Sequence, residues 1–138
     1  MAKSRPALSV LLPFHNAAFT LDASITSITG QTFFEWELLL IDNASSDTST
    51  AIAIQRAAQD ERIRLIKEPN IGITHALNTG LANAQSRYIA RMDADDISHP
   101  ERFAKQVAFL EEHADIGVLG TRTTFNTTLG RSSGMRWF

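Results

Sequence analysis

The chain has 138 residues, 43% of them hydrophobic and 20% charged, which fits a single folded globular domain and excludes a disordered or fibrous chain. The formal net charge of -2 offers no broad attraction for nucleic acid or anionic lipid, so neither is expected as a partner. The absence of cysteine excludes disulfides, thiolate nucleophiles and cysteine-ligated metals, and no run reaches the ~20 apolar residues of a transmembrane segment.

Short apolar runs alternate with amphipathic segments from the N-terminus onward. Residues 8–12 are mostly strand formers, and the proline that follows them predicts a buried strand entering a loop. Apolar residues spaced by four and three over 21–28 predict a helix that stops at Gly30. A second strand is predicted over 37–41 and a second helix over 48–58. The pattern is typical of strands and helices that alternate.

The same alternation continues in the second half of the chain. A weak third strand over 63–66 precedes a helical stretch over 74–84, and Gly80 inside this stretch indicates a close packing contact. A fourth strand is predicted over 88–92 and ends in three aspartates. The segment 98–101 resembles a helix start with proline in the first turn.

A fifth strand is predicted over 116–120, whereas 121–138 shows little periodicity. The alternating order favours an α/β fold with a doubly wound, mainly parallel sheet and right-handed crossovers. In such sheets ligands bind at the carboxyl ends of the strands, and three polar clusters fall there. They are the residues 13–16, Asp42 with Asn43, and 93–95.

The aspartates after the fourth strand suit a hard cation. Asp93, Asp95 and Asp96 follow a buried strand, so their carboxylates project from an anchored chain into a crevice. Mn²⁺ and Mg²⁺ favour carboxylate and water ligands, and substrate phosphates commonly complete their shell. The alternative is that these acidic residues only cap the next helix, a role that suits Asp96 in particular.

The polar residues after the first two strands have two interpretations each. Asp42 and Asn43 could hydrogen-bond a nucleobase or ribose, because a carboxylate accepts while a carboxamide both donates and accepts. They could equally form an Asx-turn without a ligand. His15 and Asn16 are each more typical of a turn than of a catalytic group.

The ordered set of motifs resembles family 2 glycosyltransferases of the GT-A fold. The residues 8–16 are similar to the opening strand of that family, and 41–47 to its nucleoside-binding turn. The runs 70–80, 88–96 and 100–106 follow in the family's order and approximate spacing. The resemblance covers about 8–120, which implies a nucleotide-sugar-binding subdomain over 1–120 and the start of a truncated acceptor-side region over 121–138.

The resemblance implies a metal-dependent, inverting transfer of sugar from a nucleotide diphosphate sugar to a glycan or lipid-linked acceptor in surface polysaccharide synthesis. Pro13, Asn16 and Asp42 or Asn43 would line the nucleoside pocket. Asp93 would lie near the ribose or the metal, and Asp95 would ligate Mn²⁺ or Mg²⁺ directly. These substrates imply a cytoplasmic location, which could be at the inner face of the membrane.

The sequence departs from the family pattern in two places. Asn43 stands where many members have a second aspartate, and Leu77 where many have an arginine. The family's catalytic base lies beyond the end of this chain, so no base is assigned. Apolar residues near the C-terminus favour either a surface covered by another region or a homo-oligomeric contact; they are Met135, Trp137 and Phe138.

Two other functions are compatible with parts of the sequence. The chain could bind nucleotide and metal without turnover, because the base is missing. Alternatively, Asp93 and Asp95 could be the nucleophile and general acid of a phosphatase of the haloacid dehalogenase type. Those phosphatases have the motif on their first strand and need a downstream lysine, whereas four strand-and-helix segments precede Asp93 here.

Overall fold

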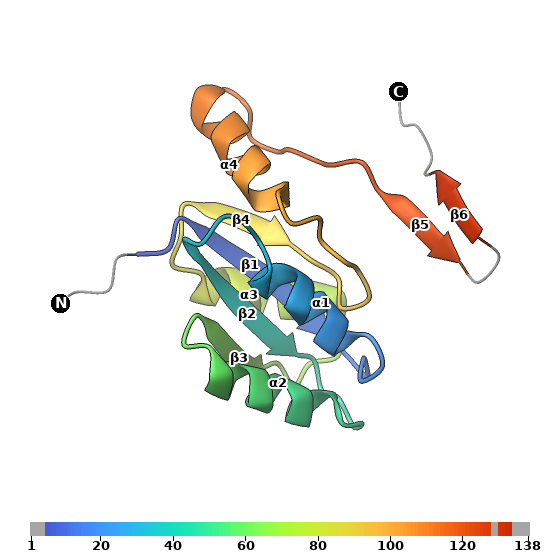
Figure 1. The fold of residues 1–138 in the computed structure, drawn as a ribbon. Coiled ribbons are helices and arrows are strands. Elements are labelled where there is room, and N and C mark those ends of the chain that lie inside the picture. Colours follow the sequence, from blue (N-terminus) through green and yellow to red (C-terminus); the bar gives the residue numbers. More distant parts are fainter. Residues whose placement is uncertain (1–4, 128–129, 134–138) are drawn as a thin grey trace.

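The computed structural model describes residues 5–127 and 130–133 (Figure 1). Four parallel strands form one sheet in the order β3-β2-β1-β4. The predicted α/β fold with a mainly parallel sheet is therefore confirmed. The strands are β1 Leu8–Phe14, β2 Trp36–Asp42, β3 Ile63–Lys67 and β4 Tyr88–Arg91.

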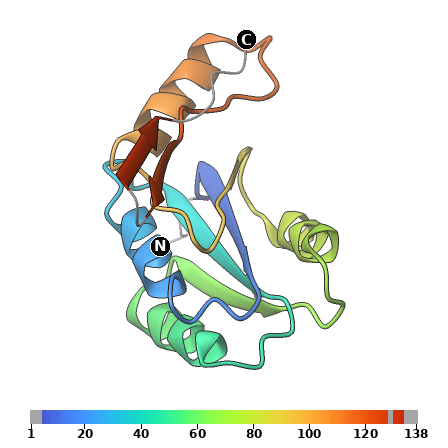
Figure 2. The same cartoon turned by 90° about the vertical axis from the view of Figure 1, so that its right-hand side faces the viewer.

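Helices cover both faces of this sheet, as Figure 2 shows in a view turned by 90°. The helices α1 (Leu21–Thr29) and α2 (Ser49–Gln59) lie on one face, and α3 (Ile73–Asn83) lies on the other. A fourth helix, α4 (Arg102–Glu112), lies beyond β4. The chain moves outward from β1 to β3 and then returns to the opposite side of β1 for β4. The strand order therefore reverses between β1 and β4, the position where open α/β sheets bind ligands.

Alternate residues of the central strands bury their side chains in two separate clusters. Val10, Leu12 and Leu38 belong to the larger cluster, which also contains residues of α1 and α2. Leu11 and Leu39 face the other way and pack with residues of α3. Because both faces are covered, β1 and β2 are buried along their whole length, which explains their nearly continuous apolar sequence.

Gly80 lets α3 approach the sheet closely, as its position inside a helix predicted. A Cβ atom at Gly80 would lie 3.2 Å from Ile41 Cδ1 and from both terminal methyl carbons of Leu11. Those side chains are buried in the interior of the sheet. A side chain at this position would therefore require these buried methyl groups or α3 itself to shift by a few tenths of an ångström.

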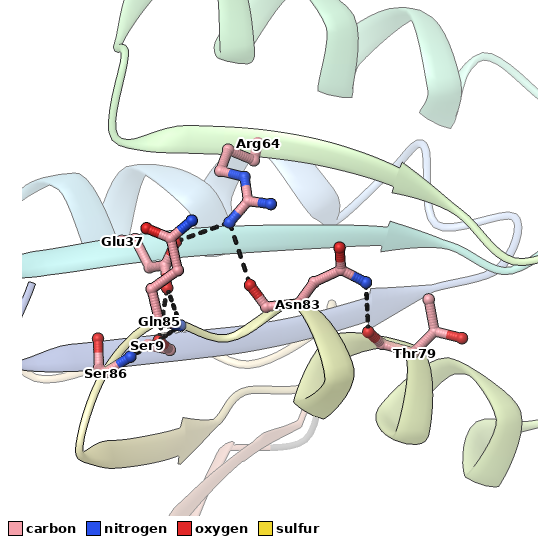
Figure 3. Close-up of polar contacts among 7 residues, drawn as sticks. All are labelled: Ser9, Glu37, Arg64, Thr79, Asn83, Gln85 and Ser86. Atoms are coloured by element: carbon pink, nitrogen blue, oxygen red, sulfur yellow. Dashed lines mark hydrogen bonds and ion pairs between the residues drawn. The ribbon is translucent and has the colours of Figure 1, made fainter. Parts of the chain in front are cut away.

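A buried polar cluster at the amino ends of the strands ties the α3–β4 connection to the sheet (Figure 3). Glu37 is only 5% exposed, and its Oε1 accepts hydrogen bonds from Ser9 Oγ at 2.6 Å and from the Gln85 amide at 2.8 Å. Arg64 donates from Nη1 to Glu37 Oε2 at 3.0 Å and to the Asn83 carbonyl at 3.2 Å. We refer to Ser9, Glu37, Arg64 and Gln85 as the amino-edge cluster.

The fifth strand predicted over 116–120 is wrong. This segment forms no strand, and its Val118 is 91% exposed. A strand requires a neighbouring strand for its backbone groups, and no described strand pairs with this segment. The apolar run instead lies beside β4 and α4. The last described strands, β5 (Thr124–Thr127) and β6 (Gly130–Ser133), pair with each other in a separate antiparallel sheet.

The predicted helix limits hold within one residue for α2 and α3, but α4 begins at Arg102, after the 98–101 segment. No side chain caps its N-terminus, so Asp96 does not act as its cap. None of the helices in the described part of the chain is long and apolar enough to span a bilayer. The C-terminal apolar residues predicted to be covered, Met135, Trp137 and Phe138, lie outside the described residues.

Candidate functional site

The predicted site residues all lie at the carboxyl edge of the sheet. β1 pairs with β2 through Phe14 but with β4 only as far as Leu11, so the two strands separate beyond that point. Pro13 is the next residue of β1 that faces β4, and its lack of an N–H group leaves no unpaired donor there. Pro13 is buried within β1 and lies where β1 extends beyond its pairing with β4.

Asp42 ends β2 with both carboxylate oxygens bonded inside the protein. Oδ1 accepts a hydrogen bond from the Ser45 amide at 2.9 Å, and Oδ2 accepts one from the Thr50 hydroxyl at 2.6 Å. The side chain is 5% exposed. These contacts need no ligand and join the end of β2 to the following loop and to α2. The bonded amide lies three residues on, not the two residues of the predicted Asx-turn.

Asn43 is also bonded on every side by the protein. Its Nδ2 donates to the Glu68 carbonyl at 3.2 Å and to the Asn70 carbonyl at 2.7 Å, while its Oδ1 accepts from the Gly72 amide at 2.8 Å. The residue is 5% exposed. Its carboxamide therefore spans from the end of β2 to the loop 68–72 between β3 and α3.

Asn16 holds the neighbouring loop in a similar way. It adopts a left-handed backbone conformation, with φ of 50°, that asparagine tolerates better than most residues. Its Oδ1 accepts hydrogen bonds from the amides of Ser46 at 2.8 Å and Asp47 at 3.2 Å. His15 is exposed, and its Nδ1 lies 2.7 Å from the Asn43 carbonyl oxygen. In this structure His15 and Asn16 therefore make the contacts of turn residues.

The aspartates after β4 contrast with these residues because they face solvent. Asp93 pairs with Arg91 at 2.9 Å and its side chain is 46% exposed. Asp95 is exposed, and no hydrogen bond to its carboxylate is found within 5–127. Partial desolvation, assisted by the charges of Asp93 and Asp95, raises the pKa of Asp96 above its ordinary value. This part of the edge therefore carries excess negative charge.

No group of three or more histidine and acidic side chains is arranged around a common metal position in the described residues. Asp93 and Asp95 offer carboxylate oxygens, the ligands that Mn²⁺ and Mg²⁺ prefer. Two aspartates fit a cation that takes its remaining ligands from water and a diphosphate, although they do not form a complete protein cage. The chemistry of this donor set is compatible with the predicted metal.

Sequence reasoning missed Glu68, which organises the loop between β3 and α3. Its Oε1 accepts from the Asn70 amide at 2.7 Å, and its Oε2 accepts from the Thr79 hydroxyl. The Thr79 hydrogen bond is the main reason that the pKa of Glu68 is lowered, and the Asn70 amide adds to it. In the sequence, an acidic residue before Pro69 indicates only a loop. Thr79 comes to lie beside Glu68 only in the folded chain.

A cavity of about 430 Å³ lies between β4, α4 and the segment 117–119. Arg87, Arg91 and Arg102 line it together with apolar residues of β4 and α4. Desolvation lowers the pKa of Arg102, which donates to the Arg91 carbonyl at 3.1 Å. The cavity borders the outer edge of β4, and none of the predicted site residues lines it.

The fold and the position of the polar clusters define an α/β protein whose polar side chains gather at the carboxyl edge, where the strand order reverses. The family model of glycosyl transferase family 2 matches residues 9–137. The chain therefore belongs to that family, as its motifs indicated.

Curated relatives agree with this membership. EpsE of Bacillus subtilis, named as a glycosyltransferase, is 46% identical over 120 residues, which cover 86% of this chain and 43% of that protein. The Escherichia coli protein WfgD, a UDP-Glc:alpha-D-GlcNAc-diphosphoundecaprenol beta-1,3-glucosyltransferase, is 36% identical over 75% of this chain and 40% of its own length. The chain thus spans less than half the length of these two relatives.

Solved structures confirm the GT-A fold. Staphylococcus aureus TarS in complex with UDP superposes with a TM-score of 0.72 at 22% identity, over 78% of this chain and 32% of that one. The mannosyltransferase PcManGT from Pyrobaculum calidifontis, in complex with GDP-Man and Mn²⁺, gives a TM-score of 0.71 at 26% identity, over 78% of this chain and 33% of that one. Both neighbours hold a nucleotide in their structures.

Proposed function

We propose that this chain is the nucleotide-sugar-binding part of a metal-dependent, inverting glycosyltransferase. The observation that carries the proposal is the position of the exposed Asp95 and the half-exposed Asp93 at the end of β4, where the strand order reverses. The loops after β1, β2 and β3 are already ordered by internal hydrogen bonds, so little rearrangement is needed for a ligand to dock beside the aspartates.

Asp95, and Asp93 after it exchanges its Arg91 partner, would hold Mn²⁺ or Mg²⁺. When bound, the cation would neutralise the charge that builds on the departing diphosphate. Asp93 and Arg91 already form a close pair, so the arginine is placed to balance the aspartate until a cation arrives. The complex of PcManGT with GDP-Man and Mn²⁺ supports this cation and this donor class.

Pro13, Asn16, Asp42 and Asn43 would form the wall of the nucleoside pocket. Their internal hydrogen bonds indicate that they shape this wall more than they supply polar atoms to the base. The acceptor is a glycan or lipid-linked sugar in surface polysaccharide synthesis, a proposal supported by the substrate in the name of WfgD. A location at the cytoplasmic face of a membrane follows from such an acceptor.

Binding without turnover remains the second candidate for this chain alone. Glu111, one of the few acidic side chains near the end of α4, accepts a hydrogen bond from the Tyr88 hydroxyl at 2.8 Å and pairs with Arg87 at 3.4 Å. These contacts make it a surface partner of β4, not a free base. The phosphatase alternative is wrong, because the chain belongs to a glycosyl transferase family.

Calorimetric titration with uridine, guanosine and thymidine diphosphates, each with and without Mn²⁺, tests the donor site. We expect one diphosphate to bind, and to bind more tightly when Mn²⁺ is present. Failure of all three to bind contradicts the proposal for this chain. Sugar transfer by the chain, compared with a form extended at the C-terminus to the length of its relatives, then separates turnover from binding alone.

A further inference from the structure

We propose that Asn43 is a positioning residue that clamps the loop 68–72, and that it supports nucleotide binding equally for every base. This inference rests on the proposed donor site but concerns a role that the sequence did not indicate. A direct base contact would instead require hydrogen-bonding groups of the Asn43 carboxamide to be free for a ligand. The described contacts point it at the loop.

The clamp depends on the two kinds of hydrogen-bonding group in a carboxamide. Both hydrogens of Asn43 Nδ2 are used, since this atom donates to the carbonyls of Glu68 and Asn70. The oxygen Oδ1 accepts from the Gly72 amide. An aspartate has the same shape but no hydrogen to donate, so it would place a buried negative charge against two carbonyl oxygens. The asparagine that departs from the common family pattern is thus the residue that this loop requires.

The backbone groups of Asn43 also make contacts within the protein. Its amide donates to the Phe14 carbonyl at 2.9 Å, and its carbonyl oxygen lies 2.7 Å from His15 Nδ1. The residue therefore connects the end of β1, the end of β2 and the loop before α3. With 5% of its surface exposed, it has little area left for a ligand.

The clamped loop determines where α3 begins. Gly72 has a φ of 138°, a conformation that side-chain-bearing residues rarely adopt, and it immediately precedes α3. The Gly72 carbonyl accepts the Ala76 amide at 3.2 Å in the first turn of the helix. Loss of the clamp would therefore free both the loop 68–72 and the first turn of α3.

The test replaces Asn43→Asp and follows the Gly72 amide by hydrogen exchange together with affinity for the three nucleoside diphosphates in Mn²⁺. A carboxylate keeps an acceptor for the Gly72 amide but loses both bonds donated to the loop and places a buried charge against two carbonyl oxygens. We expect the loop to open more often, so that exchange at Gly72 accelerates by about tenfold or more. We also expect the affinities to fall by a common factor, so that the ranking of the three diphosphates is unchanged.

The matched control is Asn16→Asp at the same edge. Asn16 uses its Oδ1 as an acceptor for two amides, a role that a carboxylate retains. Exchange at Gly72 should remain that of the unmodified chain in this control. An equal acceleration in both variants would overturn the clamp, because a general charge effect would then explain it.

Gly72→Ala provides a second route if Asn43→Asp prevents folding. This change leaves Asn43 intact but strains the loop, so it should also lower all three affinities by a common factor. An altered ranking of the diphosphates in Asn43→Asp, or unchanged affinities in Gly72→Ala, contradicts the proposal. If the unmodified chain binds no nucleotide, the donor-site proposal fails, and the Gly72 exchange rates alone decide whether the clamp exists.

Discussion

The two edges of the same sheet use polar residues in different ways. The amino-edge cluster surrounds the carboxylate of Glu37 with an arginine, a hydroxyl and an amide, and buries it. At the carboxyl edge Asp42 and Asn43 are satisfied internally, whereas Asp95 faces solvent. The comparison indicates that the amino edge serves stability, and that the carboxyl edge combines an ordered wall with charges left for a ligand.

Substitution within the amino-edge cluster should cause the largest loss of stability. Glu37→Leu leaves the Ser9 hydroxyl and the Gln85 amide without their acceptor and Arg64 without its ion partner. We expect a loss of about 3 kcal/mol in the free energy of unfolding, measured by urea denaturation. Nucleotide affinity of the folded chain should not change. Weaker nucleotide binding without destabilisation would contradict the division between the two edges.

The exposed part of the carboxyl edge should respond in the opposite way. Asp95→Ala removes a proposed metal ligand, so we expect the Mn²⁺-dependent part of nucleotide affinity to fall by about 10- to 100-fold. Stability should change by less than about 0.5 kcal/mol, because the carboxylate is exposed. Calorimetry and urea denaturation measure the two quantities. Asp115→Ala, an exposed aspartate outside the site, is the control and should alter neither.

Substitution of a hydrogen-bonded residue at the carboxyl edge should have an effect between these two in size. Thr50→Val keeps the shape of the side chain but removes the hydroxyl that donates to Asp42 Oδ2. We expect a loss of about 1 kcal/mol in stability, together with weaker binding of every nucleoside diphosphate. Thr48→Val, one residue before α2, makes no cap hydrogen bond and serves as the control. Equal effects of the two substitutions would show that the Asp42 contact is unimportant.

The smallest predicted effect is the pH dependence of stability that arises from Asp96. Because the pKa of Asp96 is raised from its ordinary 3.8, the folded state binds this proton more tightly than the unfolded state does. The protonated Asp96 carboxyl thus stabilises the folded state fully below the pKa of the unfolded chain. This stabilisation is lost as pH rises through the pKa of the folded chain. Asp96→Asn should therefore have a higher Tm than the unmodified chain at neutral pH. The difference should shrink as pH falls below the unfolded pKa, and a difference independent of pH would contradict this origin.

The sequence predicted the fold well because its apolar runs are bounded by residues with strong local effects. Gly30 ends a helix and Gly80 permits close packing, and each has the predicted role in the structure. The prediction that Pro13 stops the first strand was wrong, because β1 continues through Pro13 to Phe14 and pairs there with β2. The predicted fifth strand failed for a non-local reason. The run 116–120 has strand-forming residues, but a strand also needs a partner, and sequence pattern does not reveal one.

The site was predictable in position but less so in its contacts. Parallel topology alone brings residues 13–16, 42–43 and 93–95 to one edge of the sheet. The partners of Asn43 lie 25 to 29 residues later in a loop, so their hydrogen bonds could not be read from local spacing. Ser9 and Glu37 offered an unused clue, because each is a polar residue at the second position of a buried strand.

The close approach at Gly80 limits how this protein can be engineered. Replacing a helical glycine with alanine commonly strengthens a helix by about 1 kcal/mol, and α3 offers an obvious position for it. At Gly80 the added methyl group would lie 3.2 Å from Leu11 and Ile41, in the interior of the two central strands. Thermostabilisation of α3 therefore has to come from its outer surface, where Leu81 is exposed, and Gly80 should be kept fixed in any design library.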